Sequence, residues 1–239
     1  MSVSQNSFPK NQLLAALPAE EYQRLVPHLE LVSLPLEQVL YEPGEAISHV
    51  YFPFRSMVSL VSPMEDGSTV EFGVVSNEGM VGMPVVWGGN TTTHRAMVQI
   101  QDGGLRMKAE LLQAEFNRGS ALQSLLLRYT QALFTQASQA AACNRLHTLE
   151  ERLARWLLTV QDRIQSDELP LTQEFIAQML GTRRSGVTVT AGTLSQAGMI
   201  RYSRGKITIL NRESLEATSC ECYRVIKDDF DRLLDVKRD

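Results

Sequence analysis

The stretch from Leu171 to Ile209 limits the fold of this 239-residue chain more than any other part of it. Its apolar spacing predicts a first helix, a tight turn at Gly181, a second helix over about residues 183–196, and a short hairpin. Thr172 suits the N-cap of the first helix, because its hydroxyl can accept a hydrogen bond from an otherwise unpaired amide. Gly181 suits the turn, because glycine tolerates left-handed backbone. The pattern is typical of a helix-turn-helix followed by a β wing.

The same stretch is a basic module on an acidic protein. Residues 175–212 include six basic and no acidic side chains, whereas the whole chain has a formal charge of −4, so the remainder sums to −10. Such an asymmetry is expected where a protein meets phosphate. We therefore expect double-stranded DNA as a partner. The alternative is a small helical domain with a solvated basic face.

Within this module, the N-terminal end of the second helix is the part expected to enter the major groove. Arginine there can donate two hydrogen bonds to guanine, and threonine can bond to a base or contact the thymine methyl. The start of the first helix and the wing tip suit phosphate, which positions a protein without reading sequence. The predicted base-reading residues are Arg184, Ser185, Thr188 and Val189, and the predicted phosphate contacts are Thr172, Gln173, Arg183, Ser203, Arg204 and Lys206.

The N-terminal half has the pattern of an antiparallel β domain. Short apolar or alternating runs, separated by turns rich in glycine and acidic residues, predict a sandwich or barrel. Two short helical segments, residues 11–17 and 19–28, precede the strands. The fold class is therefore α+β. The predicted strands cover residues 50–54, 58–61, 70–75, 96–100 and 105–107.

A long helical region follows, and residues 121–160 contain neither glycine nor proline. Six of its residues follow a 4-3-4-3-4 spacing, which predicts a seam for pairing with a second copy of the chain. The alternative is packing on the chain's own β domain, and the flanking Leu125, Leu127 and Phe134 widen the apolar surface enough for both. The predicted dimer seam is Leu122, Leu126, Tyr129, Leu133, Gln136 and Ala140.

The basic module, LTQEFIAQMLGTRRSGVTVTAGTLSQAGMIRYSRGKI, resembles the Crp/Fnr family of bacterial transcription regulators. Glu42-Pro43-Gly44-Glu45, Gly79-Met80-Val81-Gly82 and the strand rhythm extend the resemblance to the N-terminal half. The resemblance implies a β-roll like a cyclic-nucleotide-binding domain, a dimerisation helix and a winged helix-turn-helix. The implied boundaries are residues 1–118 for the sensor domain, 119–142 for the dimerisation helix, 143–214 for the DNA-binding domain and 215–239 for a C-terminal helix.

In relatives that bind cyclic AMP, the phosphate cassette is similar to G-E-L-A followed by R-S/T-A, where the glutamate holds the ribose and the arginine pairs with the phosphate. Here Met83 stands where that glutamate is expected, and the arginine is missing or shifted to Arg95. An unpaired ribose hydroxyl in a buried site costs about 1–3 kcal/mol, which argues against cyclic AMP. His94 is a candidate to titrate near neutrality. The candidate effector pocket is Gly82, Met83, Pro84, His94 and Arg95; alternatively Met83 and Trp87 fill it.

The cysteines are interpreted as structural thiols. Cys143, Cys220 and Cys222 do not make a disulfide framework, and the histidines lie far from the Cys220-Cys222 pair in sequence, so no metal site is predicted. The N-terminal arm has no cysteine, which excludes an iron–sulfur cluster there. No cofactor is expected.

Other classes of function have less support. The sequence shows no nucleophile elbow, zinc-ligand spacing or phosphate-binding glycine loop, which argues against an enzyme. It has no apolar run long enough for a membrane span and no secretion signal, so a cytoplasmic location is expected. The chain is expected to be a homodimeric transcription regulator, with RNA polymerase as a further implied partner. The alternative is a ligand-sensing module that acts on a protein partner.

Overall fold

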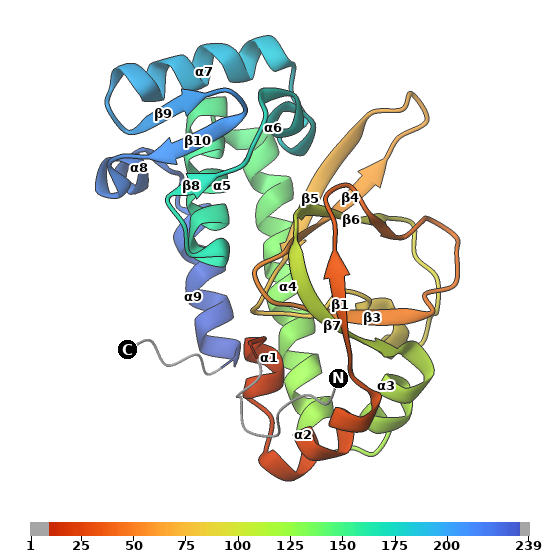
Figure 1. Cartoon of the computed structure of the whole chain (residues 1–239). Coiled ribbons are helices and arrows are strands. Elements are labelled where there is room, and N and C mark those ends of the chain that lie inside the picture. The colour runs from red at the N-terminus through yellow and green to blue at the C-terminus, as the bar shows by residue number, and fades with distance from the viewer. Residues whose placement is uncertain (1–9, 235–239) are drawn as a thin grey trace.

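The computed structural model describes residues 10–234 and shows an α+β protein with two lobes joined by one long helix (Figure 1). The N-terminal lobe is a β-roll of two antiparallel sheets, with strand orders β1-β7-β3 and β2-β6-β4-β5. The five strands predicted from the alternating pattern are all present as β3 to β7, and β1 and β2 are additions. The bounds are β1 Glu30–Leu34, β2 Val39–Tyr41, β3 His49–Pro53, β4 Met57–Pro63, β5 Thr69–Val75, β6 Arg95–Ile100 and β7 Asp102–Lys108.

Short helices close the ends of the roll. Asn11 begins the first of them, because its side chain accepts a hydrogen bond from the amide of Leu14. The same side chain donates to the carbonyls of Pro53 and Gly79, which fixes the N-terminal segment to the sheets. The bounds are α1 Gln12–Ala15, α2 Ala19–Leu25, η1 Val26–His28, η2 Met83–Val86 and α3 Ala109–Phe116.

The long helix α4, Ala121–Leu146, runs between the two lobes (Figure 1). The structure corrects the expected dimer seam, because the chain itself covers most of that face. Tyr129 donates a hydrogen bond to the carbonyl of Met80 and packs edge-on against Phe230. Gln136 accepts one from the amide of Val74. Of the predicted seam, Leu122, Leu126, Tyr129, Gln136 and Ala140 are buried and Leu133 is half-buried.

The C-terminal lobe begins at Thr148, which closes a capping box with Glu151 at the start of α5. Its core contains Trp156, whose indole donates to the carboxyl of Glu71 on β5 and so links the two lobes. Three short strands form the wing in the order β8-β10-β9. The bounds are α5 Leu149–Ile164, β8 Glu168–Leu169, α6 Gln173–Met179, α7 Arg184–Gln196, β9 Ile200–Ser203 and β10 Lys206–Ile209.

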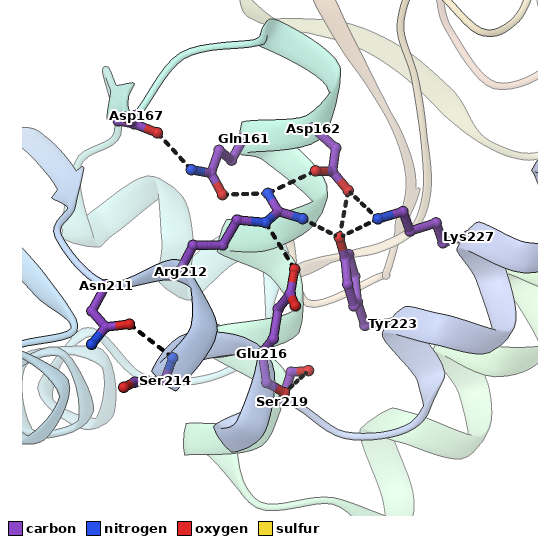
Figure 2. A network of polar contacts seen from close by, with 10 residues as sticks. All are labelled: Gln161, Asp162, Asp167, Asn211, Arg212, Ser214, Glu216, Ser219, Tyr223 and Lys227. Carbon is purple, nitrogen blue, oxygen red and sulfur yellow. Dashed lines mark hydrogen bonds and ion pairs between the residues drawn. The ribbon is translucent and has the colours of Figure 1, made fainter. Parts of the chain in front are cut away.

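The last segment was expected as one helix over residues 215–239, but the structure has two helices, α8 Arg212–Thr218 and α9 Cys222–Leu234. Residues 235–239 lie outside the described part. A polar network joins these helices to α5 (Figure 2): Arg212 pairs with Asp162 at 2.8 Å and donates to the Tyr223 hydroxyl at 2.6 Å. Helix α9 then returns along α4, where Thr135 donates to Asp229 at 2.7 Å. Helices α8 and α9 therefore fasten the C-terminal lobe to the long helix.

Candidate nucleic-acid interface and effector pocket

The helix-turn-helix forms where the sequence predicted it. The Thr172 hydroxyl accepts a hydrogen bond from the amide of Phe175 at 3.2 Å and begins α6. Gly181 has a φ of 57°, which places the turn in left-handed backbone. Val187, Ala191 and Leu194 are buried on the inner face of α7, so the opposite face of that helix points outward.

That outward face carries all four predicted base-reading residues. Arg184, Ser185, Thr188 and Val189 are exposed, and Val189 is 71% exposed despite its apolar side chain. The Thr188 hydroxyl donates to Gln173 at 2.7 Å, which couples the outer surfaces of α6 and α7. One guanidinium nitrogen of Arg184 lies 3.8 Å from Glu174, in a pair that is open to solvent on both sides. An exposed pair of this kind is weak, so Arg184 can exchange Glu174 for another partner at little cost.

The wing carries three of the six predicted phosphate contacts. Ser203, Arg204 and Lys206 are exposed, and Arg204 and Gly205 both have positive φ, of 48° and 77°, which makes the tight turn between β9 and β10. Lys206 pairs with Glu168 at 2.7 Å, and this pairing lowers the pKa of Glu168. This contact could not be predicted from the sequence, because Glu168 lies before the basic module and reaches Lys206 only through the β8–β10 pairing.

The tip of the β4–β5 hairpin lies against the helix-turn-helix. Gln178 on α6 donates to the Thr69 hydroxyl at 2.9 Å. A side-chain carbon at Gly181 would come within 2.7 Å of Val70, so glycine is needed here for close packing as well as for its backbone. The β-roll therefore contacts the turn that orients α7.

A cavity of about 230 Å³ lies between the β-roll and α4. Of the predicted effector residues, Gly82, Met83, Pro84 and His94 line it. Arg95 is not among the lining residues, because its guanidinium turns to Glu42 and forms an ion pair at 2.8 Å. Further lining residues are Tyr41, Phe72, Met80, Trp87, Leu133 and Phe134.

His94 does not titrate near neutrality, contrary to expectation. Burial lowers the pKa of His94 to about 4, since the interior disfavours the charged ring. The ring is held by the Tyr41 hydroxyl, 3.0 Å from Nε2, and packs edge-on against Phe72. The cavity therefore presents a neutral, mainly apolar surface, and no Lys or Arg is among the described residues that line it.

The structure also brings the three cysteines together beside a histidine. Cys143, Cys220 and Cys222 lie together with His147, although 77 residues separate the first two in sequence. The histidines lie far in sequence from the Cys220-Cys222 pair, but His147 stands only four residues after Cys143, and this spacing is the one local sign of the cluster.

The comparisons with known proteins agree with this architecture. Residues 151–218 match the family model of the Crp-like helix-turn-helix domain. The C-terminal lobe is a Crp-like helix-turn-helix domain.

Solved structures with the same overall fold cover both lobes. FixK2 from Bradyrhizobium japonicum aligns over 80% of this chain and 98% of its own, at 18% identity and a TM-score of 0.70. A CooA mutant from Carboxydothermus hydrogenoformans aligns over 92% and 98%, at 17% identity and a TM-score of 0.64. A CRP-family transcriptional regulator from Thermus thermophilus aligns over 79% and 96%, at 17% identity and a TM-score of 0.65. A search of curated proteins finds no match.

Within residues 10–234, every helix is too short or too polar to cross a bilayer.

Proposed function

We propose that this chain is a homodimeric transcription regulator that reads a two-fold-related DNA site through α7. The observation that carries the proposal is the exposed face of α7, which points away from the protein core and lies beside the basic wing. The exposed residues of this face are Arg184, Ser185, Thr188 and Val189. Arg184 and Thr188 have the donor groups that base edges in the major groove accept. Thr172, Gln173, Arg183, Ser203, Arg204 and Lys206 would bind the flanking phosphates.

A second face of α4 supports dimerisation. With the predicted seam covered by the chain itself, the exposed apolar residues of α4 are the candidates for contact with a second copy. Leu127 is 54% exposed and Phe134 is 73% exposed, and Ala141 continues the line at the same spacing of seven residues. Gln131 and Ser138 lie between them on the same exposed face, which completes a 4-3-4-3 seam. Dimerisation through this face would let each of the two α7 helices enter one DNA half-site, with the half-sites about one turn of the DNA helix apart.

The cavity in the β-roll is the proposed effector site, and a neutral apolar ligand fits it better than cyclic AMP. A phosphate would enter without a cation, because Arg95 is paired outside and the low pKa of His94 keeps that ring uncharged. Phe134 lines this cavity and also belongs to the exposed face of α4. A ligand there would therefore act directly on the proposed dimer contact. It can shift the equilibrium between two arrangements of the dimer only if it binds one of them more tightly.

Selection of genomic fragments by the purified full chain, followed by mobility shifts over a range of salt, tests the proposal. The expected result is enrichment of a palindromic motif whose binding depends steeply on salt. Failure to enrich any sequence, together with capture of a specific protein partner, would favour the alternative of a regulatory module that acts on protein.

A further inference from the structure

Four side chains with metal-binding atoms meet where α4 ends, α5 begins and α8 passes into α9. Cys143 lies in the last turn of α4, His147 directly follows that helix, and Cys220 and Cys222 flank the start of α9. One ligand atom from each residue lies within 4.8 Å of all the others. The three thiols are buried and the imidazole is half-buried, so the cluster is largely withdrawn from solvent.

The separations of these atoms match a tetrahedral zinc centre. Zinc–sulfur bonds of about 2.3 Å and zinc–nitrogen bonds of about 2.0–2.1 Å imply sulfur–sulfur edges of about 3.8 Å and sulfur–nitrogen edges of about 3.6 Å. The sulfurs of Cys143 and Cys220 are 3.5 Å apart. The sulfur of Cys222 lies 3.6 Å from Nδ1 of His147. Small adjustments of side-chain torsions would bring one ion within bonding distance of all four atoms.

The surroundings of the cluster supply the features that a zinc site with a histidine ligand usually has. Nε2 of His147 lies 3.2 Å from a carboxylate oxygen of Glu221, so the ring can donate its N–H there and keep the Nδ1 lone pair for a metal. Three thiolates and one Zn²⁺ carry a net charge of −1. The positive side chains of Arg155 and Arg152 lie close enough to the thiols to offset this charge. The Nε of each of these arginines is buried without a hydrogen-bond partner in the described chain.

Three neighbouring thiolates repel one another, and a divalent cation bound among them would stabilise all three at once. A metal ion therefore suits the chemistry of this cluster, in which three sulfurs and an imidazole already converge.

We propose that Cys143, His147, Cys220 and Cys222 form a structural zinc site that fastens the end of α4 to the start of α9. Zn²⁺ takes one lone pair from each of three sulfurs and from Nδ1, and the protons displaced from the thiols leave to solvent, with no change of oxidation state. Tetrahedral sites with three cysteines and one histidine are closed, without an open position for substrate, so the role is structural. The site would hold the junction between the long helix and the DNA-binding lobe.

Cobalt titration of the full-length chain, reduced and stripped of metal, tests the proposal. The expected result is one Co²⁺ per chain, with the intense ligand-field absorption of a tetrahedral centre and a thiolate-to-cobalt charge-transfer band, both lost on adding Zn²⁺. A Cys220→Ser/Cys222→Ser double variant should lose the charge-transfer band. His147→Ala should bind Co²⁺ more weakly, whereas His28→Ala, a histidine in the N-terminal lobe, should behave as the unaltered chain does.

Glu221→Gln keeps all four ligands and changes an exposed residue, so it tests the site even where the cysteine variants fold poorly. We expect this variant to bind metal about 10–100-fold more weakly with an unchanged circular-dichroism spectrum. Glu213→Gln, an exposed glutamate on α8, is the matched control and should bind as before. A reduced chain that binds no Co²⁺, or a double variant that keeps the band, would overturn the proposal. A Cys143–Cys220 disulfide formed in air by a chain that binds no metal would instead identify a redox pair.

Discussion

Replacing Arg184 by alanine should weaken binding to the cognate DNA site without weakening the fold. Arg184 is the first residue of α7, where a positive charge faces the positive end of the helix dipole, and its contact with Glu174 is long and exposed. Its loss should therefore leave the free energy of unfolding nearly unchanged. A bidentate contact with guanine is worth about 1–3 kcal/mol. A dimer has two copies, so the cognate site should lose about 2–6 kcal/mol of binding free energy, as measured by fluorescence anisotropy.

The pattern of loss matters more than its size. Discrimination between guanine and the other bases should relax at one position in each half-site, while binding to random DNA changes far less. Arg183→Ala is the matched control, because Arg183 is the N-cap of α7 and is proposed to contact phosphate. That variant should weaken cognate and random DNA alike and reduce the slope of log K against log salt by about one per chain. If Arg184→Ala produced this uniform pattern instead, α7 would not read bases through Arg184.

Three further predictions concern the other parts of the protein. Phe134→Glu should give a folded monomer in sedimentation, because Phe134 is exposed. Leu126→Glu should instead unfold the chain, because Leu126 is fully buried. If Leu126→Glu alone gave a folded monomer, the dimer seam predicted from the sequence would be right after all. Burial raises the pKa of Glu71 from 4.5 to about 7. Between these pH values the folded state therefore binds a proton that the unfolded state has lost. The free energy of unfolding should accordingly fall by about 3 kcal/mol as pH rises from 4.5 to 7. Glu71→Gln should flatten this dependence in urea titrations at several pH values, and an unchanged slope would refute the assignment. Cyclic AMP should leave the Tm unchanged in thermal-shift assays, and a rise in Tm that Arg95→Ala abolishes would contradict the neutral character of the cavity.

The sequence predicts the DNA-binding half well because its signals are local. The cap at Thr172, the turn at Gly181 and the inner face of Val187, Ala191 and Leu194 each act within one or two helical turns, and the structure has all of them. Five strands of the β-roll, β3 to β7, were also readable from alternation and turns, whereas β1 and β2 were not predicted. Local chemistry alone decides such features, so they need no knowledge of the rest of the fold.

The face of α4 could not be assigned in the same way, because two apolar stripes share this helix. A heptad-like spacing identifies an apolar stripe but not what covers it. Leu126 and Tyr129 meet the β-roll and α9, whose return along α4 is set by contacts with distant residues such as Phe230. Leu127 and Phe134 form the other stripe and remain exposed. Only the tertiary arrangement separates a core face from a face that is left for a partner.

The cysteine cluster shows how a partial sequence signal becomes specific in three dimensions. Cys143 and His147 are spaced four residues apart, so both belong to one side of the end of α4, while Cys220 and Cys222 lie on either side of Glu221. Each pair alone is a common and weak pattern. The return of α9 along α4 brings the pairs together, and the network of Arg212, Asp162 and Tyr223 holds α8 and α5 in register for that return (Figure 2). The polar network and the proposed zinc site therefore act on the same junction, so weakening the network should also weaken metal binding, although none of its residues is a ligand.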